Sequence, residues 1–430
     1  MAKKKRRRLK KSFVLYMILF MSITGIIVLL TVNFSFVGKR SVHGDAKKYS
    51  TRHCLAFYPD SGDGRSYAKE LCKLSKEDKI YDYSLVPYGD YYLIDYGNLE
   101  YFVDKSFNKL EIKEISDEGR IIIADYLRYA MKKNHPEKYY NVSFMEKSSL
   151  DNLSFDGVTY DIEGESLKCR FEEFDLDVMV PLKYMQKQMD MFFGYENEDY
   201  HKPQYLDRDP SHPVICLTFD DGPQLWAPKD ESSTARIIDT LYRYDAVGTF
   251  YVVGDCLEER SYFTDAQLIG MLKDSIRQGN EYGSHTQTHK TYLTDFAYAD
   301  DLKKEIDGPC TYLSGKLGYR MKTYRPIGGV FDDNVLSAQN LPAILWDVDS
   351  GDWEAETADE IYDQVMKYAY EDGDIIIFHD IYSTTAEAIE RLLPALIEKG
   401  CQFATISEML AYQGIDESKL SYYYNPGYFE

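Results

Sequence analysis

The feature that most constrains this fold is a regular alternation of short apolar segments and longer amphipathic segments between residues 206 and 415. This alternation is typical of parallel sheets, in which a helix connects each strand to the next. The predicted strands are 214–219, 249–253, 280–283, 323–325, 343–346, 375–378 and 403–406. The predicted helices are 234–244, 266–278, 299–317, 358–370 and 386–399. The region is therefore predicted to be an α/β domain, an incomplete or distorted (β/α) barrel.

Polar residues follow five of the predicted strands. In α/β barrels, active sites assemble at these carboxyl-terminal strand ends. Each motif alone is weak, because Asp-Asp-Gly-Pro commonly forms a turn, and the HxxxH spacing places two imidazoles on one helical face that could equally be a polar surface. Together they are hard to explain as packing, since three of the eight histidines in the chain fall within them. The motifs are TFDDGP at 218–223, HTQTH at 285–289, RPIGG at 325–329, DSGDW at 349–353 and IFH at 377–379.

In this order the five motifs resemble those of the polysaccharide deacetylase family, which is carbohydrate esterase family 4. The resemblance covers residues 206–415, nearly half of the chain. With an N-terminal apolar segment and a middle domain before it, the layout resembles that of membrane-anchored peptidoglycan N-acetylglucosamine deacetylases.

The resemblance implies a divalent metal site formed by Asp221, His285 and His289. One carboxylate and two imidazoles with open coordination positions suit a catalytic zinc ion, and cobalt or another divalent ion is the alternative. Such an ion would lower the pKa of a bound water to about 7 and polarise the amide carbonyl of a substrate.

The resemblance also implies an acid–base pair on either side of the metal. Asp220 would be the general base, held ionised and oriented by a charge-assisted hydrogen bond from Arg325. His379 would be the general acid that protonates the departing amine. Asp352 would pair with His379 and keep it protonated.

Three further residues are expected to contact the substrate. Trp353 and Ile377 would form an apolar slot for the acetyl methyl group, and a backbone N–H near Gly328 would donate to the oxyanion. Two departures from the family pattern accompany them. Ile327 and Gly328 stand where the family often has a second proline and an aromatic residue, and the link at 224–233 is unusually long.

The N-terminus predicts a single membrane-spanning helix. Basic residues dominate 1–12, and the uncharged apolar segment 13–32 is long enough to span about 30 Å of hydrocarbon. The basic flank predicts a cytoplasmic N-terminus, with the rest of the chain outside. A cleaved signal peptide is the competing interpretation, although 33–38 makes a poor cleavage site. Residues 33–50 are polar and are predicted to form a stalk.

Residues 51–205 are predicted to form a smaller α+β accessory domain without a catalytic signature. Its many tyrosines could form a sugar-stacking surface, but strand packing is the more frequent role of such residues. A polar linker follows at 201–213, and an aromatic tail ends the chain at 416–430. The predicted elements are strands at 91–96, 99–103, 158–162, 167–171 and 176–180, and a helix at 121–133.

Charge and cysteine content exclude some functions. Residues 1–40 hold ten Lys or Arg and no acid, so a net charge of −31 falls on the remainder out of −21 overall. Nucleic acid is therefore a poor partner for that remainder. Seven cysteines form no CxxC pair, which gives no support to a structural zinc site of that type. Cys54 and Cys72 could form a local disulfide, and Cys216 is predicted to pack in the core.

The leading hypothesis is hydrolysis of N-acetyl groups on a cell-wall glycan, with N-acetylglucosamine of peptidoglycan as the expected sugar. Two alternatives stay open: an O-deacetylase acting on acetylated xylan or another polysaccharide, and a non-catalytic wall-binding protein. A serine hydrolase is disfavoured, because no GxSxG motif is present. The sequence predicts neither the metal used in the cell nor the oligomeric state.

Overall fold

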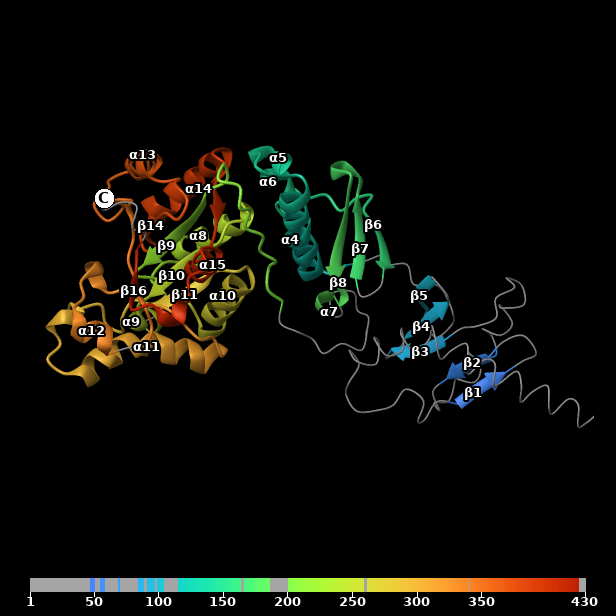
Figure 1. Cartoon of the computed structure of the whole chain (residues 1–430), viewed down its shortest axis with the longest axis horizontal. Helices are drawn as coiled ribbons and strands as arrows, with labels where there is room; N and C mark the ends of the chain where they lie inside the picture. The colour runs from blue at the N-terminus through green and yellow to red at the C-terminus, as the bar shows by residue number, and fades with distance from the viewer. Residues whose placement is uncertain are drawn as a thin grey trace, which may run out of the picture. The chain divides into compact units, whose positions relative to one another are not determined.

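The chain divides into two compact units in a computed structural model (Figure 1). One unit comprises Met1–Gly119 and Val158–Glu198, and the other comprises Arg120–Gly157 and Asp199–Glu430. The predicted accessory domain at 51–205 thus contributes to both units, and its boundaries stay a prediction. The structure describes residues 47–50, 55–58, 69, 84–88, 91–96, 99–103, 115–163, 166–185, 200–258, 261–338 and 340–424.

The first unit contains small antiparallel sheets. The most fully described one joins β6 (Thr159–Glu163), β7 (Ser166–Phe171) and β8 (Leu176–Pro181). Buried residues alternate with half-buried ones along β7 and mainly with exposed ones along β8, as expected for a sheet with one covered face. The other strands are β1 (Lys47–Ser50), β2 (Leu55–Tyr58), β3 (Ser84–Tyr88), β4 (Tyr91–Tyr96) and β5 (Leu99–Val103). In the sheet of β6 to β8, η2 (Glu172–Phe174) connects β7 to β8, and α7 (Leu182–Met185) follows β8.

The predicted strands of this region are confirmed. Of the predicted stalk at 33–50 the structure describes only 47–50, which form β1 and pair antiparallel with β2, and the stalk stays a prediction. The predicted membrane helix at 13–32 lies outside the described residues, as do the basic tail at 1–12 and the proposed Cys54–Cys72 pair. Among the residues that are described, no helix has both the length and the apolarity to cross a bilayer.

The second unit is built on a parallel sheet, which confirms the α/β class. Its main strands run in the order β11 (Glu281–Ser284), β10 (Gly248–Val252), β9 (Val214–Asp220), β14 (Ile375–His379) and β13 (Val348–Asp349), and β15 (Gln402–Phe403) pairs with the start of β9. Tyr324 bridges Ser284 on one side and Ala343 of β12 (Ala343–Ile344) on the other. Segment 343–349 therefore pairs with both edges of the sheet, as in a distorted barrel.

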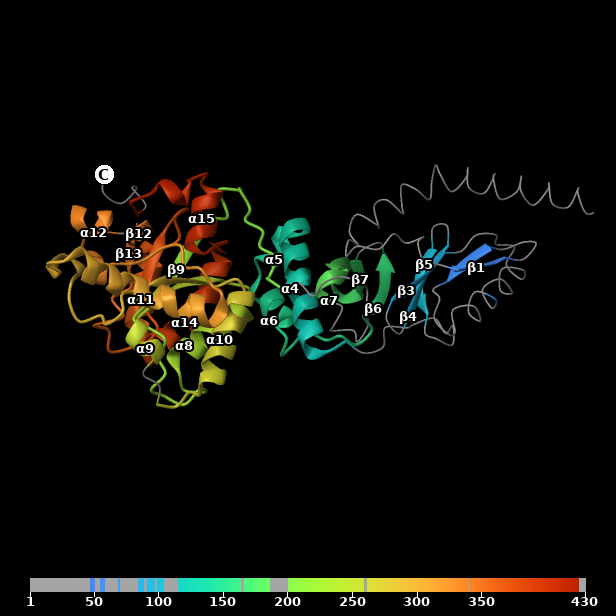
Figure 2. The same ribbon diagram turned by 90° about the horizontal axis from the view of Figure 1, so that it is seen from below.

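Helices surround these strands (Figure 2). Those predicted from periodicity are confirmed within a few residues: α8 (Ser233–Arg243), α10 (Asp265–Arg277), α11 (Ala299–Leu317), α13 (Ala358–Tyr368) and α14 (Ser383–Glu398). Shorter elements were not predicted: α9 (Gly254–Glu258), η3 (Leu293–Asp295), η4 (Ile327–Gly329), α12 (Asp333–Ser337), α15 (Ile406–Tyr412) and η5 (Glu417–Lys419). Side chains at the helix starts, such as Ser232, Thr264 and Thr357, accept hydrogen bonds from backbone N–H groups and so fix where these helices begin.

Three N-terminal helices pack in the second unit: α4 (Asp117–Asn134), α5 (Pro136–Tyr139) and α6 (Val142–Ser148). The fully buried Arg128 of α4 donates to the carbonyl oxygens of Tyr242 and Arg243, at 2.7 and 2.9 Å. These carbonyls belong to the last turn of α8, where intrahelical donors run out and the helix carries partial negative charge. The carbonyl of Tyr242 also accepts the N–H of Asp245 at 3.1 Å, so Arg128 adds a buried side-chain donor there. Arg128 therefore caps α8 from another helix.

The described part of the predicted aromatic tail, 416–424, packs on the second unit. Within it, β16 (Tyr422–Tyr423) pairs parallel with β12, and Tyr423 packs against a buried cluster that includes Val214 and Cys216. The predicted core position of Cys216 is confirmed.

Candidate metal centre and acid–base site

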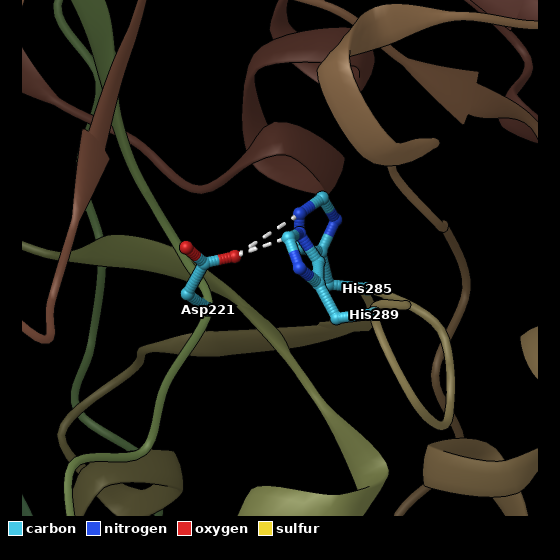
Figure 3. Close-up of side chains that lie close together, drawn as sticks. All are labelled: Asp221, His285 and His289. Carbon is cyan, nitrogen blue, oxygen red and sulfur yellow. Dashed lines mark ion pairs between the residues drawn. The ribbon is translucent and has the colours of Figure 1, made fainter. Parts of the chain in front are cut away.

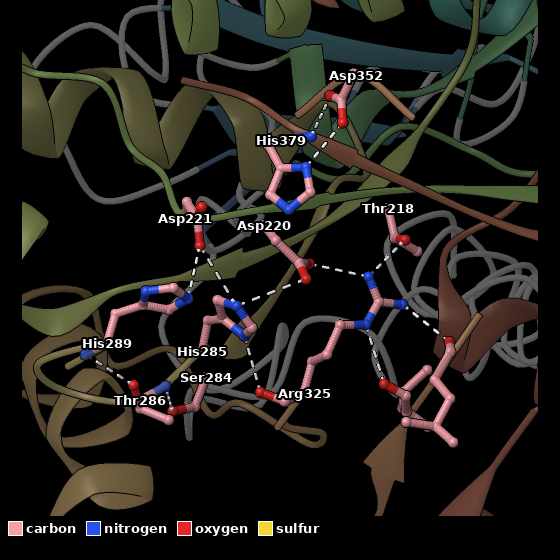
Figure 4. Close-up of polar contacts among 12 residues, drawn as sticks. Thr218, Asp220, Asp221, Ser284, His285, Thr286, His289, Arg325, Asp352 and His379 are labelled. Atoms are coloured by element: carbon pink, nitrogen blue, oxygen red, sulfur yellow. Dashed lines mark hydrogen bonds and ion pairs between the residues drawn. The ribbon is translucent and has the colours of Figure 1, made fainter. Parts of the chain in front are cut away.

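The two adjacent carboxylates lie at the end of β9. Asp220 is the last residue of this fully buried strand, and Asp221 adopts a left-handed conformation with φ of 73°. Aspartate tolerates this conformation better than most residues. Gly222 follows because a Cβ there would lie 2.2 Å from the carboxylate oxygens of Asp380. The turn therefore directs Asp220 and Asp221 to different parts of one site (Figure 4).

The two histidines lie in a turn after β11, which corrects the helical interpretation of their spacing. Thr286 and His289 both have positive φ, 73° and 52°, which an α-helix does not accommodate. His285 stays attached to the sheet, since its N–H donates to the carbonyl of Val252. The N–H of His289 donates to Thr286 Oγ1 at 3.1 Å. The turn itself brings both imidazoles to one side.

Asp221, His285 and His289 converge as predicted for a metal site (Figure 3). Oδ1 of Asp221 lies 3.1 Å from Nε2 of His289 and 3.4 Å from Nε2 of His285, and the three ligand atoms lie within 4.8 Å of one another. Nδ1 of His285 lies 2.8 Å from the carbonyl oxygen of Arg325. That carbonyl can only accept a hydrogen bond, so Nδ1 carries a proton and Nε2 is the nitrogen that faces Asp221.

The environment of these atoms fits a divalent cation. Oδ1 of Asp221 is buried and accepts no hydrogen bond from any described residue, which is costly for a carboxylate oxygen unless a positive charge lies beside it. Burial lowers the pKa of His289, and the opposing charge of Asp221 does not reverse the shift. The imidazole is therefore in the neutral form that binds metal, and one carboxylate with two imidazoles suits a zinc-type ion.

Arg325 is fully buried and fixes one oxygen of Asp220. One Nη of its guanidinium donates to Oδ1 of Asp220 at 2.9 Å and to Oγ1 of Thr218 at 2.7 Å. Its other nitrogens donate to the carbonyls of Ile344 and Leu345, both at 3.0 Å. The other oxygen of Asp220, Oδ2, lies 3.6 Å from Nε2 of His285. The carboxylate therefore has one oxygen held by Arg325 and the other directed toward the proposed metal site.

His379 and Asp352 form the predicted pair on the other side of Asp220 (Figure 4). Nδ1 of His379 lies 2.8 Å from Oδ1 of Asp352, and Thr385 donates to Oδ2 of Asp352 at 2.7 Å. Burial alone would lower the pKa of His379, but the hydrogen bond and charge of Asp352, with the charges of Asp220 and Asp221, raise it to about 9. His379 is thus protonated at neutral pH.

The residues predicted to contact the substrate lie on β14 and in the segments after Arg325 and Asp352, and their roles stay predictions. Ile377 is buried and precedes His379 by two residues on β14, so both side chains point to the same face of the sheet. Trp353 is exposed. Gly328 lies in η4 with φ of 59°.

Sequence analysis missed one buried acid beside the site. Asp380 directly follows His379, and its carboxylate accepts a hydrogen bond from Thr234 Oγ1 at 2.6 Å. Burial raises its pKa to about 7, against the opposing effect of that hydrogen bond. No local pattern marks such a residue, because its partner lies on α8.

Comparisons with known proteins agree with the family resemblance of the sequence. The sequence model of the family described as "Polysaccharide deacetylase" matches residues 207–342. A peptidoglycan-N-acetylglucosamine deacetylase of Bacillus cereus is 30% identical over 213 residues, which cover 46% of this chain and 89% of that protein. The chain belongs to the polysaccharide deacetylase family.

Another relative within this deacetylase family matches a larger share of the chain. The peptidoglycan-N-acetylmuramic acid deacetylase PdaC of Bacillus subtilis is 30% identical over 285 residues, which cover 66% of this chain and 55% of PdaC. The chain thus spans about half the length of that relative. The solved structure of PdaC matches this chain with 32% sequence identity and a TM-score of 0.42. The match covers 48% of this chain and 94% of the PdaC chain in that structure.

Proposed function

We propose that this protein is a metal-dependent hydrolase that removes N-acetyl groups from cell-wall polysaccharide, with N-acetylglucosamine of peptidoglycan as its substrate. One observation carries the proposal: the ligand atoms of Asp221, His285 and His289 lie within 4.8 Å of one another, next to Asp220 and in the same site as His379. That set supplies a cation site, a base and an acid in one place.

The chemistry of the proposed reaction divides among these side chains. A bound divalent ion, zinc or alternatively cobalt or another ion, would activate water and polarise the amide carbonyl. Asp220 takes the proton of the attacking water, because Arg325 holds one of its oxygens and leaves the other toward the site. His379 then gives its proton to the nitrogen of the departing amine, which needs a group that is charged at neutral pH.

The proposed substrate contacts complete the site. The acetyl methyl group lies between Trp353 and Ile377, and the backbone N–H near Gly328 donates to the oxyanion. A non-catalytic wall-binding role is disfavoured, since both Asp220 and His379 are present with their partners.

Family relatives support the substrate class. The Bacillus cereus relative is named for N-acetylglucosamine, and PdaC is named for N-acetylmuramic acid. N-acetylmuramic acid is the second candidate, because PdaC matches the larger share of this chain. The same residues would also serve an ester, so an O-deacetylase acting on acetylated xylan is the remaining alternative.

The proposed location is the outer face of the cell membrane. The basic residues of 1–12 and the apolar segment 13–32 support a single-pass anchor with a cytoplasmic N-terminus. Its partners would then be the membrane and the cell-wall glycan, and nucleic acid is disfavoured by the acidic remainder of the chain.

The test is acetate release by the zinc-loaded full-length chain from peptidoglycan, from N-acetylglucosamine oligomers and from acetylated xylan. Mass analysis of the digested peptidoglycan identifies which sugar has lost its acetyl group. We expect release from peptidoglycan at glucosamine positions, and loss of release in Asp220→Asn with zinc binding retained. Release from xylan alone, or an equally active Asp220→Asn chain, contradicts the proposal.

A further inference from the structure

An exposed tyrosine ring lies over the backbone of the arginine loop. Tyr292 follows His289 by three residues, and Gly328 follows Arg325 by three. A Cβ built on Gly328 would lie 3.2 Å from Cε1 of Tyr292 and 3.8 Å from its hydroxyl oxygen. The ring therefore takes the space that a side chain at position 328 would need, and it links the loop of a proposed metal ligand to the arginine loop.

The backbone that carries this ring is fixed. Leu293, the next residue, is buried in a cluster with Leu302 and Ile306. The carbonyl oxygen of Tyr292 accepts a hydrogen bond from the N–H of Asp295 at 3.0 Å. Yet Tyr292 itself is 49% exposed. A tyrosine side chain has only two rotatable side-chain bonds, so it loses little conformational entropy when a ligand contacts it.

Position 328 is constrained to glycine on two grounds. Its φ of 59° lies in the left-handed region, and the ring of Tyr292 is the nearest group to its missing side chain. With Ile327 and Gly328 at these positions, the arginine loop has no aromatic ring of its own. Tyr292 supplies the ring at this point of the site.

We propose that Tyr292 forms a subsite for a pyranose ring next to the sugar that loses its acetyl group; this rests on the proposed function. A pyranose ring has C–H groups on its face and hydroxyls at its rim, which match an apolar aromatic face with a phenol hydroxyl at its edge. Because the ring of Tyr292 is half exposed and lies against Gly328, three residues beyond Arg325, we expect it to contact the sugar next to the one that reacts.

Binding of the β-1,4-linked N-acetylglucosamine tetramer tests the subsite without turnover. The zinc-loaded full-length chain carries Asp220→Asn to stop the reaction, and titration calorimetry gives the Kd. Adding Tyr292→Ala is expected to weaken binding about tenfold, whereas Tyr292→Phe keeps the ring and stays within about twofold. Tyr368→Ala is the matched control, because this exposed tyrosine ends α13, before the loop that leads into β14.

Kinetics of the chain without Asp220→Asn give a second readout. Tyr292→Ala is expected to lower the ratio of kcat/KM for the tetramer to that for single N-acetylglucosamine about tenfold. Equal tetramer Kd with and without the ring, or no tetramer binding at all, overturns the subsite. A chain that binds the tetramer through Tyr292 but releases no acetate from any glycan leaves the subsite standing and contradicts the proposed function.

Discussion

Asp352 contacts His379 with both of its carboxylate oxygens. Oδ1 lies 2.8 Å from Nδ1 of the imidazole, and Oδ2 accepts the backbone N–H of His379 at 2.7 Å. The second bond fixes the carboxylate relative to β14, so the first one fixes the orientation of the ring. The negative charge also favours the protonated imidazole, and the ring presents Nε2 as the remaining proton donor.

The pH dependence of the proposed reaction follows from this pair. The pKa of His379 is raised to about 9, so kcat/KM is expected to fall as pH rises through about 9 and the acid is lost. In Asp352→Asn the charge of this carboxylate is gone and burial still lowers the pKa of the imidazole, so the alkaline limb of the profile moves to lower pH. The measurement is the pH profile of acetate release.

The matched control for that profile is Asp359→Asn, which removes an exposed carboxylate paired with Arg391 on the surface. Its pH profile is expected to match the wild type. An unchanged alkaline limb in Asp352→Asn contradicts the role of Asp352.

The same pair makes stability depend on pH. Since the folded-state pKa of His379 lies above its unfolded value, the stabilisation by Asp352 is complete below about pH 6.5 and is lost as pH rises through about 9. The difference in unfolding free energy between wild type and Asp352→Asn is therefore expected to shrink from pH 6 to pH 10. Urea unfolding at both pH values measures it, and a difference that grows with pH argues against the pair.

Arg325 cannot be replaced by lysine. Its guanidinium donates in several directions, to Asp220, to Thr218 and to strand carbonyls, and an ammonium group lacks that planar arrangement of donors. Arg325→Lys is expected to lower kcat about a hundredfold, because Asp220 is no longer oriented. Arg236→Lys, at a half-exposed pair with Glu390, is the control. Equal kcat values for the Arg325→Lys chain and the wild type count against the positioning role.

Sequence patterns predicted the longer strands and the helices of the second unit well, because buried strands and amphipathic helices have strong local signatures. Two predicted strands were too long: 323–325 is a single bridge position at Tyr324, and 403–406 reduces to β15, with α15 beginning at Ile406. The spacing of His285 and His289 was misread, since a spacing of four positions places side chains on one face of a helix and also at the two ends of a tight turn. Only the positive φ values of Thr286 and His289 distinguish the two, and those depend on the surrounding loop. The predicted strand at 343–346 is shortened to β12, because segment 343–349 leaves one edge of the sheet and pairs at the other edge as β13.

Partners distant in sequence could not be predicted. Thr218 contacts Arg325 across 107 positions, and Thr385 contacts Asp352 across 33. Arg128 reaches the end of α8 across 114 positions, which is why its helix was assigned to the accessory domain. Such contacts depend on tertiary packing, which leaves no periodicity in the sequence.

Arg128 predicts a stability effect away from the active site. Arg128→Met would leave the last carbonyls of α8 without their buried donor, and it would remove one of the positive charges near Asp125 and Asp245. We expect destabilisation of about 3 kcal/mol, measured by urea unfolding. Arg243→Met, which breaks an exposed pair with Asp239, should change the unfolding free energy by less than about 1 kcal/mol. Equal effects of the two substitutions contradict this capping.

The most direct test of the account is a zinc titration of the chelator-treated full-length chain, with acetate release from peptidoglycan as the readout. If Asp221, His285 and His289 hold one catalytic ion, activity returns in proportion to zinc and reaches its maximum at about one equivalent per chain. His289→Ala should stay inactive at one equivalent, whereas His212→Ala, which replaces a half-buried histidine paired with Asp207, should behave as wild type. Full acetate release in excess chelator, or an unaffected His289→Ala chain, would contradict the account.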